Sequence, residues 1–225
     1  MALRITFSEP RFHITFAGRI AARIALYSAR SIGMAATIVF LSVPDVPRLF
    51  WIGVLGALFF ADKIYHAGGA KDSLLFLPPA AIRGGREVNA ASYAAPSSYR
   101  ILESAYDAAV ISRGNFHLHL LEKLIEHRDI AAAFLRMGTD RAAFRSRVRE
   151  AVGEAAGTSG GRDELAAAVT AIGQNAFLHA FHDGDAFIEP SHLFSALGET
   201  RDPAVGTLFA LFQIGAADVR AALLF

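Results

Sequence analysis

The sequence of 225 residues contains no cysteine, which excludes disulfide bonds, thiolate chemistry and cysteine-ligated zinc. It has no excess of charge of either sign, because 22 basic and 21 acidic side chains leave a formal net charge of +1. This balance argues against binding to nucleic acid through a general electrostatic attraction. No phosphate-binding loop of the form G-x-x-x-x-G-K-[ST] occurs, and no serine, histidine and aspartate stand in a recognisable nucleophile motif. The residues therefore predict neither an enzyme nor a cofactor.

Apolar residues are abundant instead, at 53% of the chain, and the excess lies in the first third. Two uncharged runs, residues 32–43 and 49–61, are separated by a turn that contains two prolines. Each run is shorter than the roughly 20 residues that span a bilayer, but both lengthen if flanking side chains reach the headgroups. We therefore predict a membrane helical hairpin with a basic N-terminus over residues 1–70. The side chains expected at the membrane interface are Arg23, Arg30, Trp51, Lys63 and Tyr65.

Basic residues lie before the first apolar run and after the second, which predicts that both ends of the hairpin face the cytoplasm. The chain would then belong to the inner membrane, with lipids among its partners. Three other interpretations stay open for the two runs: insertion without spanning, two core helices of a soluble domain, and a cleaved signal peptide. After the hairpin, the glycine, alanine and serine residues of segment 71–95 predict a flexible linker.

The rest of the chain contains an internal repeat, a feature that determines the whole architecture. When His192 is aligned with His119, the apolar residues and the Arg-Asp pair that follow each histidine align as well. Each copy then continues through an apolar helix to a glycine, Gly138 or Gly215, which we expect to end that helix.

The spacing of apolar residues predicts four helices in each copy and no convincing strand. The first helix of the first copy is expected to begin with Ser97 or Ser98 as its N-cap. The sequence therefore predicts an all-α fold. Its two four-helix repeats are expected over residues 96–153 and 163–225, joined by a linker over residues 154–162.

The order of short motifs in the two copies resembles the N-terminal repeat domain of the Clp family of AAA+ unfoldases, over about residues 96–225. The matching pieces are His192-Leu193-Phe194, Asp202-Pro203-Ala204-Val205 and Ile214-Gly215 in the second copy, and His119-Leu120-Leu121, Asp129-Ile130-Ala131 and Met137-Gly138-Thr139-Asp140 in the first. The resemblance implies two repeats related by a pseudo-twofold axis. It also implies a domain that recruits protein substrates or adaptors to an ATP-driven unfoldase or protease, by binding and not by catalysis.

The resemblance places the candidate protein-binding surface at Leu118, His119, Ser191 and His192. Some members of the family recognise phosphorylated arginine with an acidic residue just before the repeat histidine. Leu118 and Ser191 occupy these positions here, so that specificity is not expected. The two histidines themselves are expected to cap or pack within the helices.

Two alternatives stay open beside a membrane-tethered protein-binding module. The chain could be the N-terminal portion of a longer Clp-type ATPase. It could also be a small metal-dependent hydrolase that uses His179, His182 and Asp183, although Asp183 lies in an ordinary turn sequence. The basic run from Arg136 to Arg149 is interspersed with acids, which favours a solvated face, with lipid or protein contact as the next choice.

Overall fold

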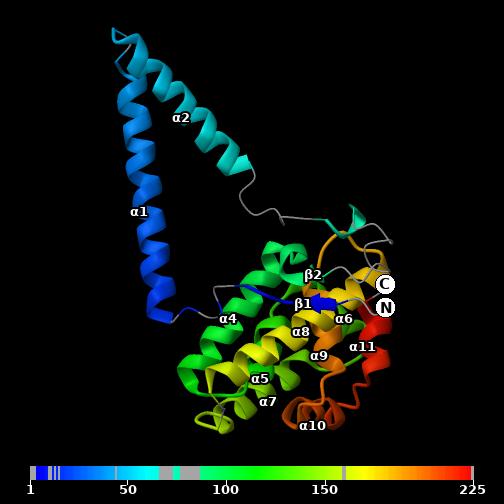
Figure 1. Ribbon diagram of the computed structural model, residues 1–225. Coiled ribbons are helices and arrows are strands. Elements are labelled where there is room, and N and C mark those ends of the chain that lie inside the picture. The colour runs from blue at the N-terminus through cyan, green and yellow to red at the C-terminus, as the bar shows by residue number, and fades with distance from the viewer. Residues whose placement is uncertain are drawn as a thin grey trace. The chain divides into compact units, whose positions relative to one another are not determined.

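The computed structural model describes residues 4–9, 12, 14, 16–43, 45–65, 73–76, 87–158 and 161–223 (Figure 1). The chain divides into two compact units, which are described separately. One consists of His13–Gly69 and the other of Met1–Phe12 together with Ala70–Phe225. Nearly all of the described secondary structure is helical, which confirms the predicted all-α class.

The smaller unit is a pair of antiparallel helices, α1 (Phe16–Leu41) and α2 (Pro47–Tyr65). Small residues let the two backbones approach closely along one seam. A Cβ atom added at Gly56 would lie 2.6 Å from Thr37 Oγ1, and one added at Gly53 would lie 2.8 Å from the backbone nitrogen of Leu41. The helical hairpin that the sequence predicts is therefore present, with glycines at its internal contact.

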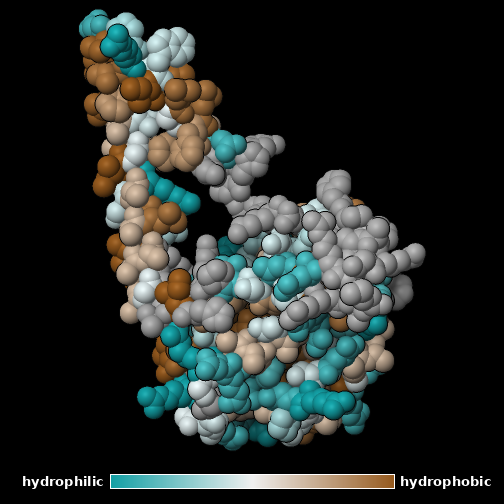
Figure 2. All heavy atoms as spheres, in the orientation of Figure 1, coloured by the Kyte–Doolittle hydropathy of each residue, from teal (hydrophilic) through white to brown (hydrophobic). Residues whose placement is uncertain are grey.

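The large apolar side chains of this unit point outward, and apolar residues cover most of its visible face (Figure 2). Within the described residues, one unbroken helix, Ile20–Leu41, is long and apolar enough to cross a membrane, and α2 does not meet the same criteria. Trp51 is 61% exposed and Arg30 is also exposed, whereas the side chains of Arg23, Lys63 and Tyr65 lie outside the described part. Insertion of the hairpin into a bilayer stays a prediction.

The larger unit contains two successive sets of four helices. The first set is α4 (Pro96–Ser112), α5 (Phe116–Ile125), α6 (Arg128–Arg136) and α7 (Arg141–Glu154). The second set is α8 (Arg162–Asp183), α9 (Pro190–Gly198), α10 (Pro203–Leu211) and α11 (Ala216–Leu223).

Packing between the two sets follows an approximate twofold relation. Helices α4 to α7 correspond in order to α8 to α11, and the first two pairs of equivalent helices pack on each other, α4 on α8 and α5 on α9. The contact of α6 with α9 corresponds to that of α10 with α5. The contact of α11 with α6 corresponds to that of α7 with α10. Exchanging the first set for the second leaves this pattern of neighbours unchanged. The predicted pseudo-twofold arrangement of two four-helix repeats is therefore confirmed.

Four buried phenylalanines form a closed circuit between the repeats. Phe134 and Phe144 of the first repeat lie with ring centroids 4.9 Å apart, and Phe194 and Phe209 of the second lie 6.0 Å apart. Contacts of 5.9 Å between Phe134 and Phe194 and 6.0 Å between Phe144 and Phe209 close the circuit. Each repeat alone would expose its two rings to water, so the repeats stabilise each other.

Equivalent helices end in the same way in both repeats, with a residue in the left-handed region. After α6 this residue is Gly138, with φ of 66°, as predicted. The corresponding residue after α10 is Gln213, with φ of 56°, so the prediction that Gly215 ends that helix is wrong. The structure explains the error, because the N–H groups of Thr139 and Ile214 make the same closing bond to the carbonyls of Phe134 and Phe209.

The start of α4 also differs from the prediction. The helix begins at Pro96, and its N-cap is Ala95, which makes no side-chain capping bond. With Pro96 as the first helical residue, Ser97 and Ser98 lie inside the first turn of α4, so neither of them is the N-cap.

The larger unit also includes a short N-terminal segment, whose structure the sequence patterns did not predict. Strand β1 (Arg4–Thr6) pairs in parallel with β2 (Glu87–Asn89), which leads into the 3-10 helix η3 (Ala90–Tyr93). Another 3-10 turn, η2 (Leu74–Phe76), is held by a bond from Leu74 N–H to the carbonyl of Ala186. Residues 87–95 therefore pack as part of the domain, whereas the sequence predicts a flexible linker there.

The N-terminal segment seats Phe7 directly against the backbone of α8. A Cβ atom at Gly173 would lie 2.2 Å from Phe7 Cδ2, so only glycine fits at this position. Phe7 and Phe12 are both buried, and Tyr106 donates a hydrogen bond of 2.9 Å to the carbonyl of Phe12.

We expect Gly173→Ala to displace Phe7 and to destabilise the domain by about 1–2 kcal/mol, because overpacking outweighs the gain in helix propensity. Amide hydrogen exchange over residues 4–12 should increase at the same time. The matched control is Gly153→Ala in α7, where an added Cβ meets no atom within 4 Å. That change should stabilise the protein by up to about 1 kcal/mol in chemical unfolding. Equal effects of the two substitutions would contradict the contact between Phe7 and Gly173.

Candidate functional site

The four residues predicted to bind protein occupy equivalent places in the two repeats, within the first turns of α5 and α9. They do not form one site. Leu118 is only 1% exposed, and both histidines are also buried, so Ser191 is the most accessible member of the set. Their roles as binding residues stay predictions, and the two histidines have clear structural partners.

His192 caps the helix that contains it. Its Nδ1 accepts a hydrogen bond of 2.9 Å from the N–H of Glu189, and its Nε2 lies 2.8 Å from Asp185 Oδ2. Burial lowers the pKa of His192 in spite of the nearby carboxylates of Asp185 and Asp183, so the ring is neutral at neutral pH. Because both ring nitrogens are engaged, this histidine is not free to act as a general base for Ser191.

His119 has a related role in the first repeat. Its Nε2 lies 2.8 Å from Ser112 Oγ, at the end of α4. Ser112 and Asp185 each stand seven residues before their histidine, so the same position supplies the partner in both repeats. Burial also lowers the pKa of His119. The expected capping or packing role of the two histidines is what the structure shows.

The residues of the alternative metal site are not brought together. His179 Nε2 lies 3.3 Å from Glu199 Oε2, and Asp183 Oδ1 lies 3.4 Å from Arg220 Nη2. Across the part of the chain that the structure describes, no three histidine or acidic side chains are placed to hold a metal ion. The hydrolase alternative therefore has no site built from His179, His182 and Asp183.

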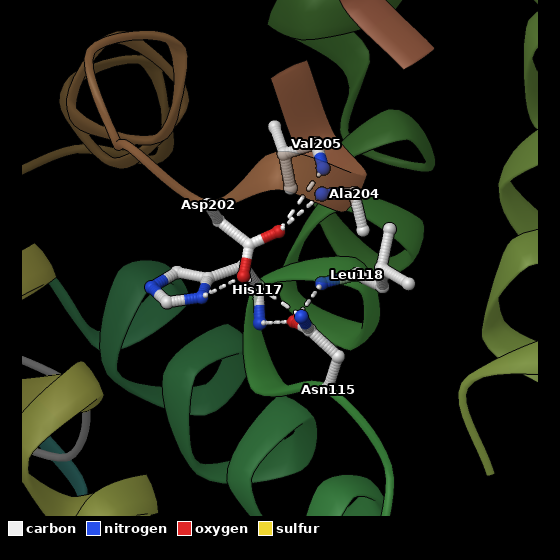
Figure 3. A network of polar contacts seen from close by, with 6 residues as sticks. All are labelled: Asn115, His117, Leu118, Asp202, Ala204 and Val205. Atoms are coloured by element: carbon white, nitrogen blue, oxygen red, sulfur yellow. Dashed lines mark hydrogen bonds and ion pairs between the residues drawn. The ribbon is translucent and has the colours of Figure 1, made fainter. Parts of the chain in front are cut away.

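A polar network centred on Asp202 joins the two repeats (Figure 3). Asp202 Oδ1 accepts hydrogen bonds from the N–H groups of Ala204 and Val205, at 3.0 and 3.1 Å, and so caps α10. Asp202 Oδ2 accepts a bond of 2.8 Å from Asn115 Nδ2 and lies 3.1 Å from His117 Nδ1. Asn115 and Asp202 are 87 residues apart in sequence, so this contact spans the interface between the repeats.

Asn115 is itself the N-cap of α5, through Oδ1 bonds from the N–H groups of His117 and Leu118. The N-termini of α5 and α10 thus meet at a single carboxylate. Burial alone would raise the pKa of Asp202, but the hydrogen bonds from His117, Asn115 and the Val205 N–H outweigh it and hold the pKa well below its usual range. An aspartate directly before a proline is a typical N-cap sequence, but the bond from Asn115 to Asp202 leaves no pattern in the local sequence.

Beside this network lies an open groove of about 380 Å³, which we call groove 1. Its lining is predominantly apolar and includes Leu118, whose N–H group is capped by Asn115. Helix α10 forms one wall and contains no charged residue, and its Leu211 is 57% exposed. The groove is lined by Leu118, Ala151, Ala155, Ala204, Leu208 and Leu211, with Arg147, Glu150, Glu154 and Thr207 at its polar positions.

A smaller hollow of about 250 Å³, groove 2, lies beside the histidine of the second repeat. Its lining is mainly charged or hydroxylated, and Ser191 replaces the leucine found at the equivalent position of groove 1. It is lined by Asp183, Asp185, Ser191, His192, Ser195, Arg220 and Leu223. Of the residues predicted from the sequence, Leu118 thus lines the mainly apolar groove 1, and Ser191 and His192 line the mainly polar groove 2.

The equivalent helices α6 and α10 differ at their last residue. Arg136 and Leu211 each lie two positions after a phenylalanine of the central circuit. Arg136 Nη1 donates a hydrogen bond of 2.7 Å to the carbonyl of Ala222, which ties α6 to α11. Leu211 instead lines groove 1 with an apolar side chain.

Comparison with known proteins supplies one match. The family model for the Clp repeat (R) N-terminal domain matches residues 96–211, which is slightly more than half of the chain. The match runs from the first residue of α4 to the last residue of α10, and so includes both sides of the Asp202 network and groove 1. Searches of curated proteins and of solved structures gave no match.

We expect Asp202→Ala to cost about 2–3 kcal/mol of unfolding free energy at pH 7, because it removes a helix cap and leaves Asn115 and His117 without their acceptor. The matched control is Asp140→Ala, which removes a cap of the same two-bond kind from α7 and should cost about 1 kcal/mol.

The contribution of Asp202 should also depend on pH. Its folded pKa is depressed, so the stabilisation is complete above the unfolded value of about 3.9 and is lost as the pH falls further. Urea unfolding at several pH values should therefore show the gap between wild type and Asp202→Ala narrowing below about pH 4. A gap that stayed constant down to pH 2.5 would contradict the assignment.

Proposed function

The chain belongs to the Clp repeat N-terminal domain family, and from that premise we propose that it recruits protein substrates or adaptors for an ATP-dependent unfoldase or protease. The domain is a protein-interaction module, so its role is binding. The match to the family is the observation that carries the proposal, and groove 1 supplies the surface that suits it best.

Groove 1 has the properties that a binding site for an exposed apolar segment needs. Most of its lining is apolar, and the polar side chains are three residues of α7, Arg147, Glu150 and Glu154, and one of α10, Thr207. An unfolding or misfolded client exposes apolar side chains that are normally buried, and these lose contact with water when they fill such a groove. Glu154, which has no ion-pair partner among the described residues, favours a segment that also contains a lysine or arginine.

Groove 2 is the weaker candidate. Its aspartates are already engaged by His192 and Arg220, so a ligand would have to replace existing ion pairs. Of the four residues predicted as a binding surface, Leu118 is therefore the one we place at the client site, because it lines groove 1. Ser191 and His192 line groove 2, and His119 supports the helix that presents Leu118.

The proposed module is attached to the membrane through the hairpin of α1 and α2. The apolar helix Ile20–Leu41 supports this, and so does the outward orientation of the large apolar side chains on α2. Attachment would raise the effective concentration of the binding domain near clients at the inner membrane, without any increase in its intrinsic affinity. The expected partners are therefore protein clients or adaptors, a Clp-type ATPase or protease, and membrane lipids.

We expect Leu211→Arg to abolish client binding in groove 1, because it places a charge on the apolar wall. The matched control is Leu135→Arg, at an 83% exposed leucine of the equivalent helix α6, which does not line groove 1. A photo-crosslinking amino acid at Thr207, on the groove rim, would report binding in isolated membranes. Protein adducts should fall at least about tenfold in Leu211→Arg, corresponding to about 1.4 kcal/mol, and stay unchanged in Leu135→Arg.

Adducts that persist in Leu211→Arg, or that fall equally in both variants, would contradict groove 1 as the client site. Identification of the adducts by mass spectrometry then tests the functional class. Proteins whose turnover slows in cells that carry Leu211→Arg are the expected clients.

A further inference from the structure

The hairpin is inserted within a folded domain. Along the chain, strand β1 precedes α1 and strand β2 follows α2, yet the two strands pair with each other. Arg4 pairs with Glu87, Ile5 with Val88 and Thr6 with Asn89. Both ends of the hairpin therefore emerge from the same compact unit.

The pairing of β1 depends on the folded repeats. Gln174 Nε2, on α8, donates a hydrogen bond of 2.7 Å to the carbonyl of Ile5, and Tyr106, on α4, donates one to the carbonyl of Phe12. Asn89 exchanges two bonds with Ser8, donating to its carbonyl and accepting from its N–H. These contacts join the N-terminal segment to elements far away in sequence, so the segment must lie in the same compartment as the repeats when they fold.

This connection limits how the chain can cross a bilayer. A folded domain with a polar surface does not pass through lipid, so a chain that leaves it and returns to it crosses an even number of times. If α1 crosses, a later segment has to bring the chain back before β2. Among the described residues between α1 and β2, the apolar candidate is α2.

Helix α2 is suited to this return path when it is paired with α1. Its 19 residues give a length of about 28 Å, close to the roughly 30 Å of the hydrocarbon core. Its charged residues, Arg48, Asp62 and Lys63, lie near its two ends. The contact with α1 uses Gly53 and Gly56, and the large side chains that face outward are Trp51, Ile52, Leu55, Leu58 and Phe59.

We propose that α1 and α2 cross the bilayer as a pair, and that the pairing of β1 with β2 holds the N-terminus and the repeat domain on the same membrane face. The proposal rests on the membrane attachment proposed above and adds the path of the chain. It assigns α2 as a second membrane helix. It also excludes a cleaved signal peptide, because cleavage after α1 would remove the buried residues Phe7 and Phe12 from the domain.

The connection is short, which narrows the class of partner. Three residues lie between the buried Phe12 and the first residue of α1, and three extended residues reach about 10 Å. The binding domain therefore has little freedom to search the cytoplasm. The partner that fits is a segment of a membrane protein, or of a protein bound to the membrane, that is exposed next to the bilayer.

The absence of cysteine allows a direct test by single-cysteine labelling of the full chain in its membrane. Three exposed positions report the path: Ser8 in the N-terminal segment, Asp45 in the turn between α1 and α2, and Arg128 on the repeat domain. Each is changed to cysteine in turn and treated with a membrane-impermeant maleimide, in inside-out vesicles and in intact spheroplasts. We expect Ser8→Cys and Arg128→Cys to react only in inside-out vesicles, and Asp45→Cys to react only in spheroplasts.

Each other outcome has a distinct meaning. Reaction of Ser8→Cys and Arg128→Cys from opposite faces would overturn the shared location of the two segments. Reaction of Asp45→Cys from the same face as the other two would overturn the double crossing and indicate insertion without spanning. Recovery of the chain in the carbonate-soluble fraction would overturn the membrane attachment itself and leave the proposed binding in groove 1 to be judged by its own test.

A second variant tests the strand pairing without changing the hairpin. Gly173→Ala displaces Phe7, so protease added to inside-out vesicles should cut within residues 1–12 faster than in wild type, by at least about threefold, while Asp45→Cys keeps its labelling pattern. Unchanged cleavage would show that the N-terminal segment is not held by the domain.

Discussion

The closed circuit of four phenylalanine rings is the constraint on which the rest of this structure depends. Each repeat supplies two rings and completes its core only against the other. The repeats therefore fold as one body. The helix ends that face across the interface then need partners from the opposite repeat, and Asp202 and Asn115 supply them. Groove 1 lies beside this junction, so its shape depends on both halves of the domain.

The two repeats share the same helix order and packing but differ in the residues at their surface. Both use a buried histidine in the same helix turn, with a partner seven residues earlier. The residue before the histidine is Leu118 in the first repeat and Ser191 in the second. The last residue of the third helix is Arg136 in the first repeat and Leu211 in the second. Leu118 and Leu211 both line groove 1, whereas Ser191 lines groove 2. The two grooves therefore differ in chemistry although the fold is nearly symmetric.

The parts of the fold that follow from local patterns were predictable. The repeated histidine and the apolar spacing predict the helices of both repeats and their pseudo-twofold relation, because periodic burial leaves a signal in sequence. Features that depend on distant contacts were not predictable. Strand β1 has three residues, too few for a pattern of alternation, and its bond to Gln174 spans 169 positions. The end of α10 was misplaced because Gln213, and not a glycine, occupies the left-handed conformation.

The insertion of the hairpin between two paired strands has a practical consequence for dividing this protein into parts. A fragment that begins at residue 96 contains the region that matches the family, but it lacks Phe7, Phe12 and the strand pair. The surface of α8 at Gly173, against which the ring of Phe7 packs, is then uncovered. A unit that keeps these contacts is obtained by excising α1 and α2 and joining the N-terminal segment to the region of η2. Because β1 precedes the hairpin and pairs with β2 after it, no single truncation can remove the hairpin and leave the strand pair intact.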